Sequence, residues 1–201
     1  MISTLAVTTA AATRDLTVLA RLKTDLGIAD IAQDAALADT IREASDAICR
    51  FCARPEGFGR ETVMETWRLD RAAECLILAR DIAPAIASVT EDGVALAASD
   101  YLLSGSLLYR LSSDAPTAWT ARKVAVTYAA GWALLADVPY DLERACLDLA
   151  ASIWASRGRD RTLRSEAADG VGSVSYLDPR DGSGLPQAIA DAVASYRRLV
   201  D

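Results

Sequence analysis

The spacing of apolar residues changes along this chain, and the change constrains the fold more than any other feature. From residue 17 to residue 55, apolar side chains recur every three or four positions, as in amphipathic helices. Between residues 62 and 130, short apolar runs alternate with turn-prone residues, as in antiparallel strands. Helical spacing returns at residue 139 and again at residue 185. The pattern predicts an α+β protein, mainly α: a helical bundle with an antiparallel β excursion between helices 2 and 3.

Local signals predict where each helix begins and ends. Four helices are expected, over about residues 17–27, 34–53, 139–157 and 185–200. Gly27 is suited to end the first helix, because glycine readily adopts the left-handed conformation of a helix C-terminus. Pro55 prevents the second helix from continuing. Pro139 and Pro186 are favourable first-turn residues for the last two helices.

The remaining segments have other expected roles. The β excursion spans about residues 62–130, with a hairpin turn at Glu91–Gly93 and strict alternation from Val124 to Tyr128. Residues 1–12 are weakly apolar and no basic region precedes them, so a loose arm is expected rather than a signal peptide. The glycine-containing segment 164–184 is expected to be a flexible loop. The whole chain, 1–201, is expected to form a single domain.

Composition disfavours several classes of function. The chain has no histidine, so it has neither a Ser-His-Asp nor a Cys-His nucleophile, and we expect no enzymatic activity. The formal net charge of −7 disfavours a nonspecific nucleic-acid binder, which would present a basic surface. No apolar run reaches the eighteen residues that a membrane-spanning helix needs.

The cysteines include one motif with chemical potential, Cys49-Arg50-Phe51-Cys52. A CxxC pair can bind zinc or exchange thiols, but structural zinc needs four ligands. Cys75 and Cys146 are isolated in the sequence, and no histidine can complete a site. The pair also lies near a helix C-terminus, whereas the N-terminus favours the thiolate. Core packing is the favoured interpretation, with no metal and no cofactor expected.

The order of motifs resembles that of head-tail connector proteins, or adaptors, of tailed phages and gene transfer agents. After Leu16–Leu26, these motifs are LADTIREASDAICRFCARP (37–55), WRLD (67–70), VTEDGV (89–94), DYLL (100–103), VTYAAGW (126–132), DVPYDLERACLDLAASIW (137–154), SEAADGVGSVSY (165–176) and LPQAIADAVASYRRLV (185–200). No single motif is very specific, because each consists mainly of packing and turn residues. The resemblance lies in the ordered set, which covers nearly the whole chain.

The resemblance implies an assembly role in the neck of a virion or virus-like particle, for a protein made in the bacterial cytoplasm. Such proteins form a dodecameric ring of identical subunits under the portal protein. A tail-side stopper or tail terminator protein is the partner below, and DNA passes through the channel without sequence-specific binding. No membrane is involved.

The alternative is a DNA-binding packaging factor resembling a small terminase subunit. Residues 1–60 carry more acidic than basic charges, which counts against that alternative.

Two groups of residues are candidates for contacts within such a particle. A portal-binding surface is expected on the C-terminal helix, at Ile189, Val193, Tyr196, Arg197, Arg198 and Val200. The alternative is that this helix packs back onto its own bundle. A subunit interface is expected at Arg157, Arg159, Arg161 and Arg164. Solvated arginines beside a helix C-terminus, or phosphate contacts, would also explain that run.

An acidic helix face is a further candidate. Asp39, Glu43 and Asp46 share one face of the second expected helix. They suit either a solvated face or an acidic channel wall that repels DNA phosphates.

Overall fold

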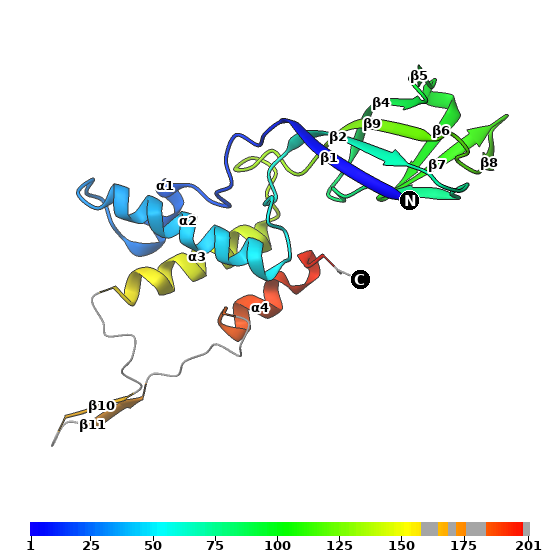
Figure 1. Cartoon of the computed structure of the whole chain (residues 1–201). Coiled ribbons are helices and arrows are strands. Elements are labelled where there is room, and N and C mark those ends of the chain that lie inside the picture. The colour runs from blue at the N-terminus through cyan, green and yellow to red at the C-terminus, as the bar shows by residue number, and fades with distance from the viewer. Residues whose placement is uncertain (158–164, 169–171, 176–183, 199–201) are drawn as a thin grey trace. The chain divides into compact units, whose positions relative to one another are not determined.

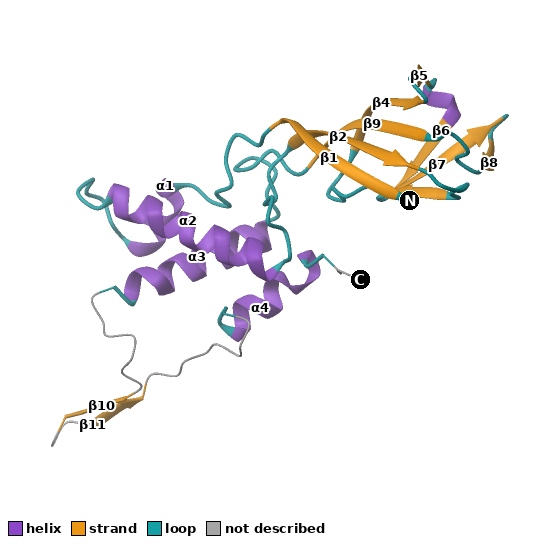
Figure 2. Ribbon diagram, in the orientation of Figure 1, coloured by secondary structure: helices purple, strands orange, loops and turns teal. Residues whose placement is uncertain are grey.

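The computed structural model describes residues 1–157, 165–168, 172–175 and 184–198, and the chain divides into two compact units (Figure 1). Unit 1 comprises Met1–Thr13 and Phe58–Ala133, and unit 2 comprises Arg14–Gly57 and Leu134–Asp201. The two larger sheets belong to unit 1 and the four α-helices to unit 2 (Figure 2). Unit 1 therefore interrupts the helical sequence between the second and third helices.

A five-stranded antiparallel sheet forms one half of unit 1. Its strands follow the order β1 (Ile2–Thr9), β2 (Glu61–Arg68), β9 (Lys123–Ala130), β4 (Ala85–Glu91) and β5 (Val94–Ala95). Val124, Val126 and Tyr128 are fully buried, which confirms the alternation predicted for this strand. The hairpin expected at Glu91–Gly93 is also confirmed, because it joins β4 to β5 and its residues Asp92 and Gly93 have positive φ.

A four-stranded antiparallel sheet forms the other half of unit 1. It comprises β3 (Cys75–Ile77), β7 (Leu107–Ser112), β6 (Tyr101–Ser104) and β8 (Ala115–Thr117). Both sheets contribute to one hydrophobic core, in which Trp67, Trp119 and Tyr128 are the largest buried side chains. The Trp119 indole N–H donates a hydrogen bond to the Leu108 carbonyl at 3.1 Å, so its polar atom is satisfied.

Unit 2 contains α1 (Leu19–Leu26), α2 (Asp34–Phe51), α3 (Tyr140–Ala155) and α4 (Gln187–Val193), followed by the short 3-10 helix η2 (Ala194–Tyr196). Its core consists of the apolar stripes of these helices, including Leu22, Leu37, Ile48 and Leu142. Gly27 ends α1 in the left-handed conformation, as its position predicted. The strands β10 (Ser165–Ala168) and β11 (Gly172–Ser175) pair with each other.

The expectation of a mainly α helical bundle with a β excursion is wrong. Helix and strand make nearly equal contributions, 32% and 31% of the residues, so the protein is mixed α and β. Residues 62–130 are not an appendage to a bundle, because they form most of a unit with its own buried core. Residues 1–12, expected as a loose arm, supply the strand β1. Leu5 alone in β1 is half-buried, and the other seven residues are exposed. Because an exposed edge strand of this kind needs no alternation of apolar and polar residues, the sequence pattern does not predict it.

Gly131 permits a close backbone approach at the end of β9. A Cβ on Gly131 would lie 2.3 Å from the Gly59 carbonyl oxygen, and the residue has a φ of +100°. We expect Gly131→Ala to destabilise the protein by roughly 2–4 kcal/mol, because it adds a clash to backbone strain. Urea unfolding measures this loss.

Gly93→Ala is the matched control for this clash. Gly93 has a similar φ of +90°, but nothing lies within 4 Å of an added Cβ. That variant should cost only about 1 kcal/mol, from strain alone. Equal costs for the two variants would show that the approach to Gly59 is unimportant.

Candidate functional site

The C-terminal segment, which the sequence predicts to bind a portal, packs on helices of its own unit. Leu185, Ile189, Ala190 and Val193 are buried, and α4 lies against α3. The Cys52 thiol of the α2 C-terminus donates a hydrogen bond to the Val193 carbonyl at 3.6 Å. The apolar face of α4 is therefore part of the core of unit 2.

Polar contacts extend this docking beyond α4. The Arg54 Nε–H donates to the Tyr196 carbonyl at 2.9 Å, and the Arg198 backbone N–H donates to the Cys52 carbonyl at 2.9 Å. The Arg198 guanidinium also pairs with Glu56. These contacts join the end of the chain to the segment that follows α2.

Tyr196 links the same segment to the start of α3. Its hydroxyl donates a hydrogen bond to Asp141 Oδ1 at 2.6 Å. Burial, together with this carboxylate, raises the pKa of Tyr196 to about 12, so the phenol stays protonated and remains a donor at neutral pH.

The residues predicted to bind a portal are thus in different environments. Ile189 and Val193 are buried, Tyr196 and Arg198 are half-buried with partners, and Val200 lies outside the described residues. Arg197 is exposed, with its guanidinium 5.7 Å from the centre of the Phe51 ring. In the structure this segment packs onto helices of its own chain, which was the alternative to portal binding. Contact with a portal stays a prediction.

The arginine run is only partly described. The Arg157 guanidinium lies 4.4 Å from the centre of the Trp154 ring, a cation–π contact at the end of α3. Arg159, Arg161 and Arg164 lie outside the described residues. The proposed role of this run in a subunit interface stays a prediction.

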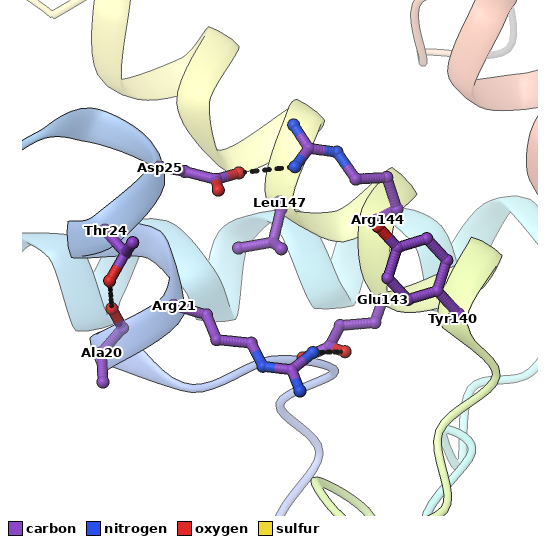
Figure 3. A pocket seen from close by; sticks show the side chains of 8 residues that line it. All are labelled: Ala20, Arg21, Thr24, Asp25, Tyr140, Glu143, Arg144 and Leu147. Carbon is purple, nitrogen blue, oxygen red and sulfur yellow. Dashed lines mark hydrogen bonds and ion pairs between the residues drawn. The ribbon is translucent and has the colours of Figure 1, made fainter.

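A pocket of about 310 Å³ lies between α1 and α3 (Figure 3). Two ion pairs cross it: Arg144 Nη1 lies 2.8 Å from Asp25 Oδ2, and Arg21 contacts Glu143. Leu147 lies between the two pairs. Each arginine that lines the pocket is thus neutralised by a carboxylate, and the pairs tie the two helices together. The arrangement leaves no unpaired charged side chain among the lining residues to bind a charged ligand.

The acidic face of α2 is solvated and partly paired. Asp39 contacts Arg42, Asp46 lies 3.5 Å from Arg14, and Glu43 is exposed. Exposed pairs of this kind contribute little to stability. They leave an acidic surface with no metal-binding cluster in the described residues.

The CxxC cysteines pack in the core of unit 2. Burial raises the pKa of Cys49 and of Cys52 to about 11, and that of Cys146 to about 12. These thiols are therefore protonated at neutral pH, whereas metal binding and thiol exchange require the thiolate. In the part of the chain that the structure describes, no group of three or more His, Cys, Asp or Glu residues could hold a metal ion.

Sequence reasoning missed three buried carboxyl groups in the described residues, of which that of Glu65 is the most deeply buried. It is 2% exposed, and its Oε2 accepts hydrogen bonds from the Tyr128 hydroxyl at 2.9 Å and from the Ala79 N–H at 3.0 Å. Burial raises the pKa of Glu65 above its usual range. The detectable signal was a charged residue between Val63 and Trp67, on the apolar side of a strand. Its contacts join three segments of unit 1, so its role is structural.

We expect Val193→Ala to destabilise the protein by about 2 kcal/mol, because it removes two buried methyl groups and leaves a cavity. Ala192→Gln, at the adjacent exposed position, should change stability by less than about 0.5 kcal/mol. Chemical denaturation of both variants measures the difference. An unchanged midpoint for Val193→Ala would show that α4 is not part of the folded core in solution.

The thiols should differ in reactivity. Cys75 is half-buried, whereas the other three cysteines are buried. Titration of the native protein with a thiol reagent should therefore modify Cys75 first, and all four cysteines only in denaturant. The Cys75→Ser variant identifies the fast thiol. Fast modification of Cys49 or Cys52, or zinc that co-purifies with the protein, would contradict core packing of the CxxC pair.

None of the described helices has the length and apolar character needed to cross a bilayer. No family model matches the chain, and no curated protein matches it.

Solved structures do match, and three of them are chains of gene transfer agent (GTA) particles. A chain from the neck of the empty GTA particle, computed with C6 symmetry, is 20% identical, with a TM-score of 0.58 over 98% of this chain and 97% of that chain. A chain from the neck of the native particle, computed with C12 symmetry, is 19% identical, with a TM-score of 0.57 over 98% and 97%.

The third is a chain from the virion of the native GTA particle, 19% identical, with a TM-score of 0.59 over 98% of this chain and 96% of that chain. At such low identity the likeness concerns the fold. The chain shares its fold, over nearly its whole length, with chains of GTA particles, two of them from the neck.

Proposed function

We propose that this chain is a structural, non-enzymatic connector in the neck of a gene transfer agent or tailed-phage particle. The observation that carries the proposal is the fold shared with neck chains over 98% of the sequence. The match includes both units, so the similarity is not limited to one common structural motif. The ordered motifs in the sequence point to the same class independently.

In this proposal, twelve copies form a ring that links the portal of the head to a tail-side stopper or tail terminator. The neck structures that share the fold were computed with C6 and C12 symmetry, which supports a rotationally symmetric assembly. Symmetry would also multiply weak contacts between the ring and the portal. Once one copy binds the portal, its neighbours bind at high effective concentration.

The electrostatics of the chain suit a channel that DNA crosses without sticking. The net charge is −7, and the arginines around the α1–α3 pocket are neutralised by carboxylates. A net negative charge repels DNA phosphates and so disfavours nonspecific binding to DNA. The same features disfavour the alternative of a DNA-binding packaging factor.

The test is to remove the protein from a particle-producing strain. Heads should then fill with DNA but lack tails, because the neck cannot be completed. Complementation with a tagged copy should restore tails, and electron microscopy should locate the tag at the neck.

The purified protein should not shift duplex DNA at physiological salt. Tight binding that weakens steeply with added salt, together with empty heads in the deletion strain, would contradict the connector and favour the packaging factor.

A further inference from the structure

The strand β1 forms one edge of the five-stranded sheet and carries no charged side chain. Its eight residues, Ile2–Thr9, are apolar or hydroxylated. Seven of them are exposed, including Ile2 at 69% and Val7 at 47%. Soluble proteins usually protect an edge of this length with charges, prolines or a covering segment, because its outward N–H and C=O groups can pair with another strand.

β1 is nevertheless held firmly in place on its inner side. It pairs with β2 from Ile2↔Arg68 to Thr9↔Thr62. The Met1 amino group lies 2.9 Å from Asp70 Oδ1, and the Thr8 hydroxyl donates a hydrogen bond to the Thr62 carbonyl at 3.0 Å. Because β1 is already ordered, a second strand can pair with it without the entropic cost of ordering β1.

The opposite edge of the same sheet has a matching uncharged stretch. β5 covers only Thr90 and Glu91 of β4, which leaves Ala85–Ser88 at the edge. These four residues carry no charge, and Ala85, Ala87 and Ser88 are exposed. The register of this stretch with β9 shifts between Ile86 and Ser88, and that of β1 with β2 shifts between Val7 and Thr9, so each edge contains one irregularity. Each copy of the chain therefore carries two unlike, uncharged edges whose regular parts are suited to main-chain pairing.

Strand directions make the two edges compatible in a ring. The strands β1, β2, β9 and β4 are each antiparallel to the next, so β1 and β4 run in opposite directions. If neighbouring copies are related by rotation about a ring axis, β1 of one copy meets β4 of the next in antiparallel orientation. An unlike pair of edges gives a head-to-tail contact, and such contacts close into rings.

We infer that β1 of each copy pairs with the Ala85–Ser88 stretch of β4 in the neighbouring copy, so that the five-stranded sheets join around the ring. This inference rests on the proposed function, and it names the subunit contact that the function needs. Main-chain pairing of this kind supplies affinity, while side chains beside the edge set the register.

Disulfide trapping tests the contact in assembled particles. Thr4 and Ala6 project on the face of the sheet that carries Met64, and Ala85 and Ser88 project on that same face. Opposed residues in antiparallel strands have Cα atoms about 4.5–5.5 Å apart, which permits a disulfide. The background is Cys75→Ser, which removes the half-buried thiol. One cysteine is placed on β1, at Thr4 or Ala6, and one on β4, at Ala85 or Ser88. Intact particles that carry each pair are then oxidised.

At least one of the four combinations should give covalent dimers and higher multimers of the chain, detected on non-reducing gels. Met64→Cys in place of Ala6→Cys should give none, because β2 is already paired on both sides. Particles with normal necks and no multimer in any combination would overturn the inference but leave the proposed function standing. Absence of the chain from the neck would overturn both.

Two other outcomes would also overturn the choice of partner. Multimers from Ala6→Cys alone would show β1 pairing with β1, and a cross-link to a different polypeptide would show a strand from another neck protein. As a second test, Ala6→Lys should reduce the yield of tailed particles at least tenfold, whereas Met64→Lys on the same sheet face should have little effect. Both variants should melt as the parent protein does. Equal yields from the two would count against the edge contact.

Discussion

The close contact between the backbones at Gly59 and Gly131 is the constraint on which unit 1 depends. Here the chain enters the unit before β2 and leaves it after β9, and the two segments form a parallel bridge between Gly59 and Trp132. Hydrogen bonds from the Arg60 N–H to the Trp132 carbonyl and from the Trp132 N–H to the Phe58 carbonyl close it at 2.7 and 2.9 Å. A side chain on Gly131 would prevent this approach.

This closure explains how a sheet unit is inserted between two helices without disrupting either core. Both cores are built from residues distant in sequence. Trp67, Trp119 and Tyr128 belong to the core of unit 1, while Leu37 and Leu142 contribute to the core of unit 2. Because the chain enters and leaves unit 1 side by side, α2 and α3 can pack together although 88 residues separate Phe51 from Tyr140.

Several charged side chains link elements of unit 2. Glu143 accepts a hydrogen bond from the Thr17 hydroxyl and pairs with Arg21, which links α1 to α3. Glu56 pairs with Arg198 and so secures the end of the chain. The chain as a whole carries a net charge of −7, as a neck component that lets DNA pass would require under the proposed function.

Local sequence alone determined where most helices and several turns lie. Gly27 and Pro55 stop helices by backbone geometry, and the alternation at Val124, Val126 and Tyr128 marks a strand, because these signals act within a few residues. Tertiary structure decided the fold class and which side chains are exposed. β1 shows no alternation of buried and exposed residues, because it lies at the edge of the sheet and nearly all of its side chains are exposed. Its place in the sheet comes from main-chain pairing with β2, which is distant in the sequence. Ile189 and Val193 are buried because α4 lies against α3. An amphipathic helix shows which of its faces is apolar, but only the folded chain shows what covers that face.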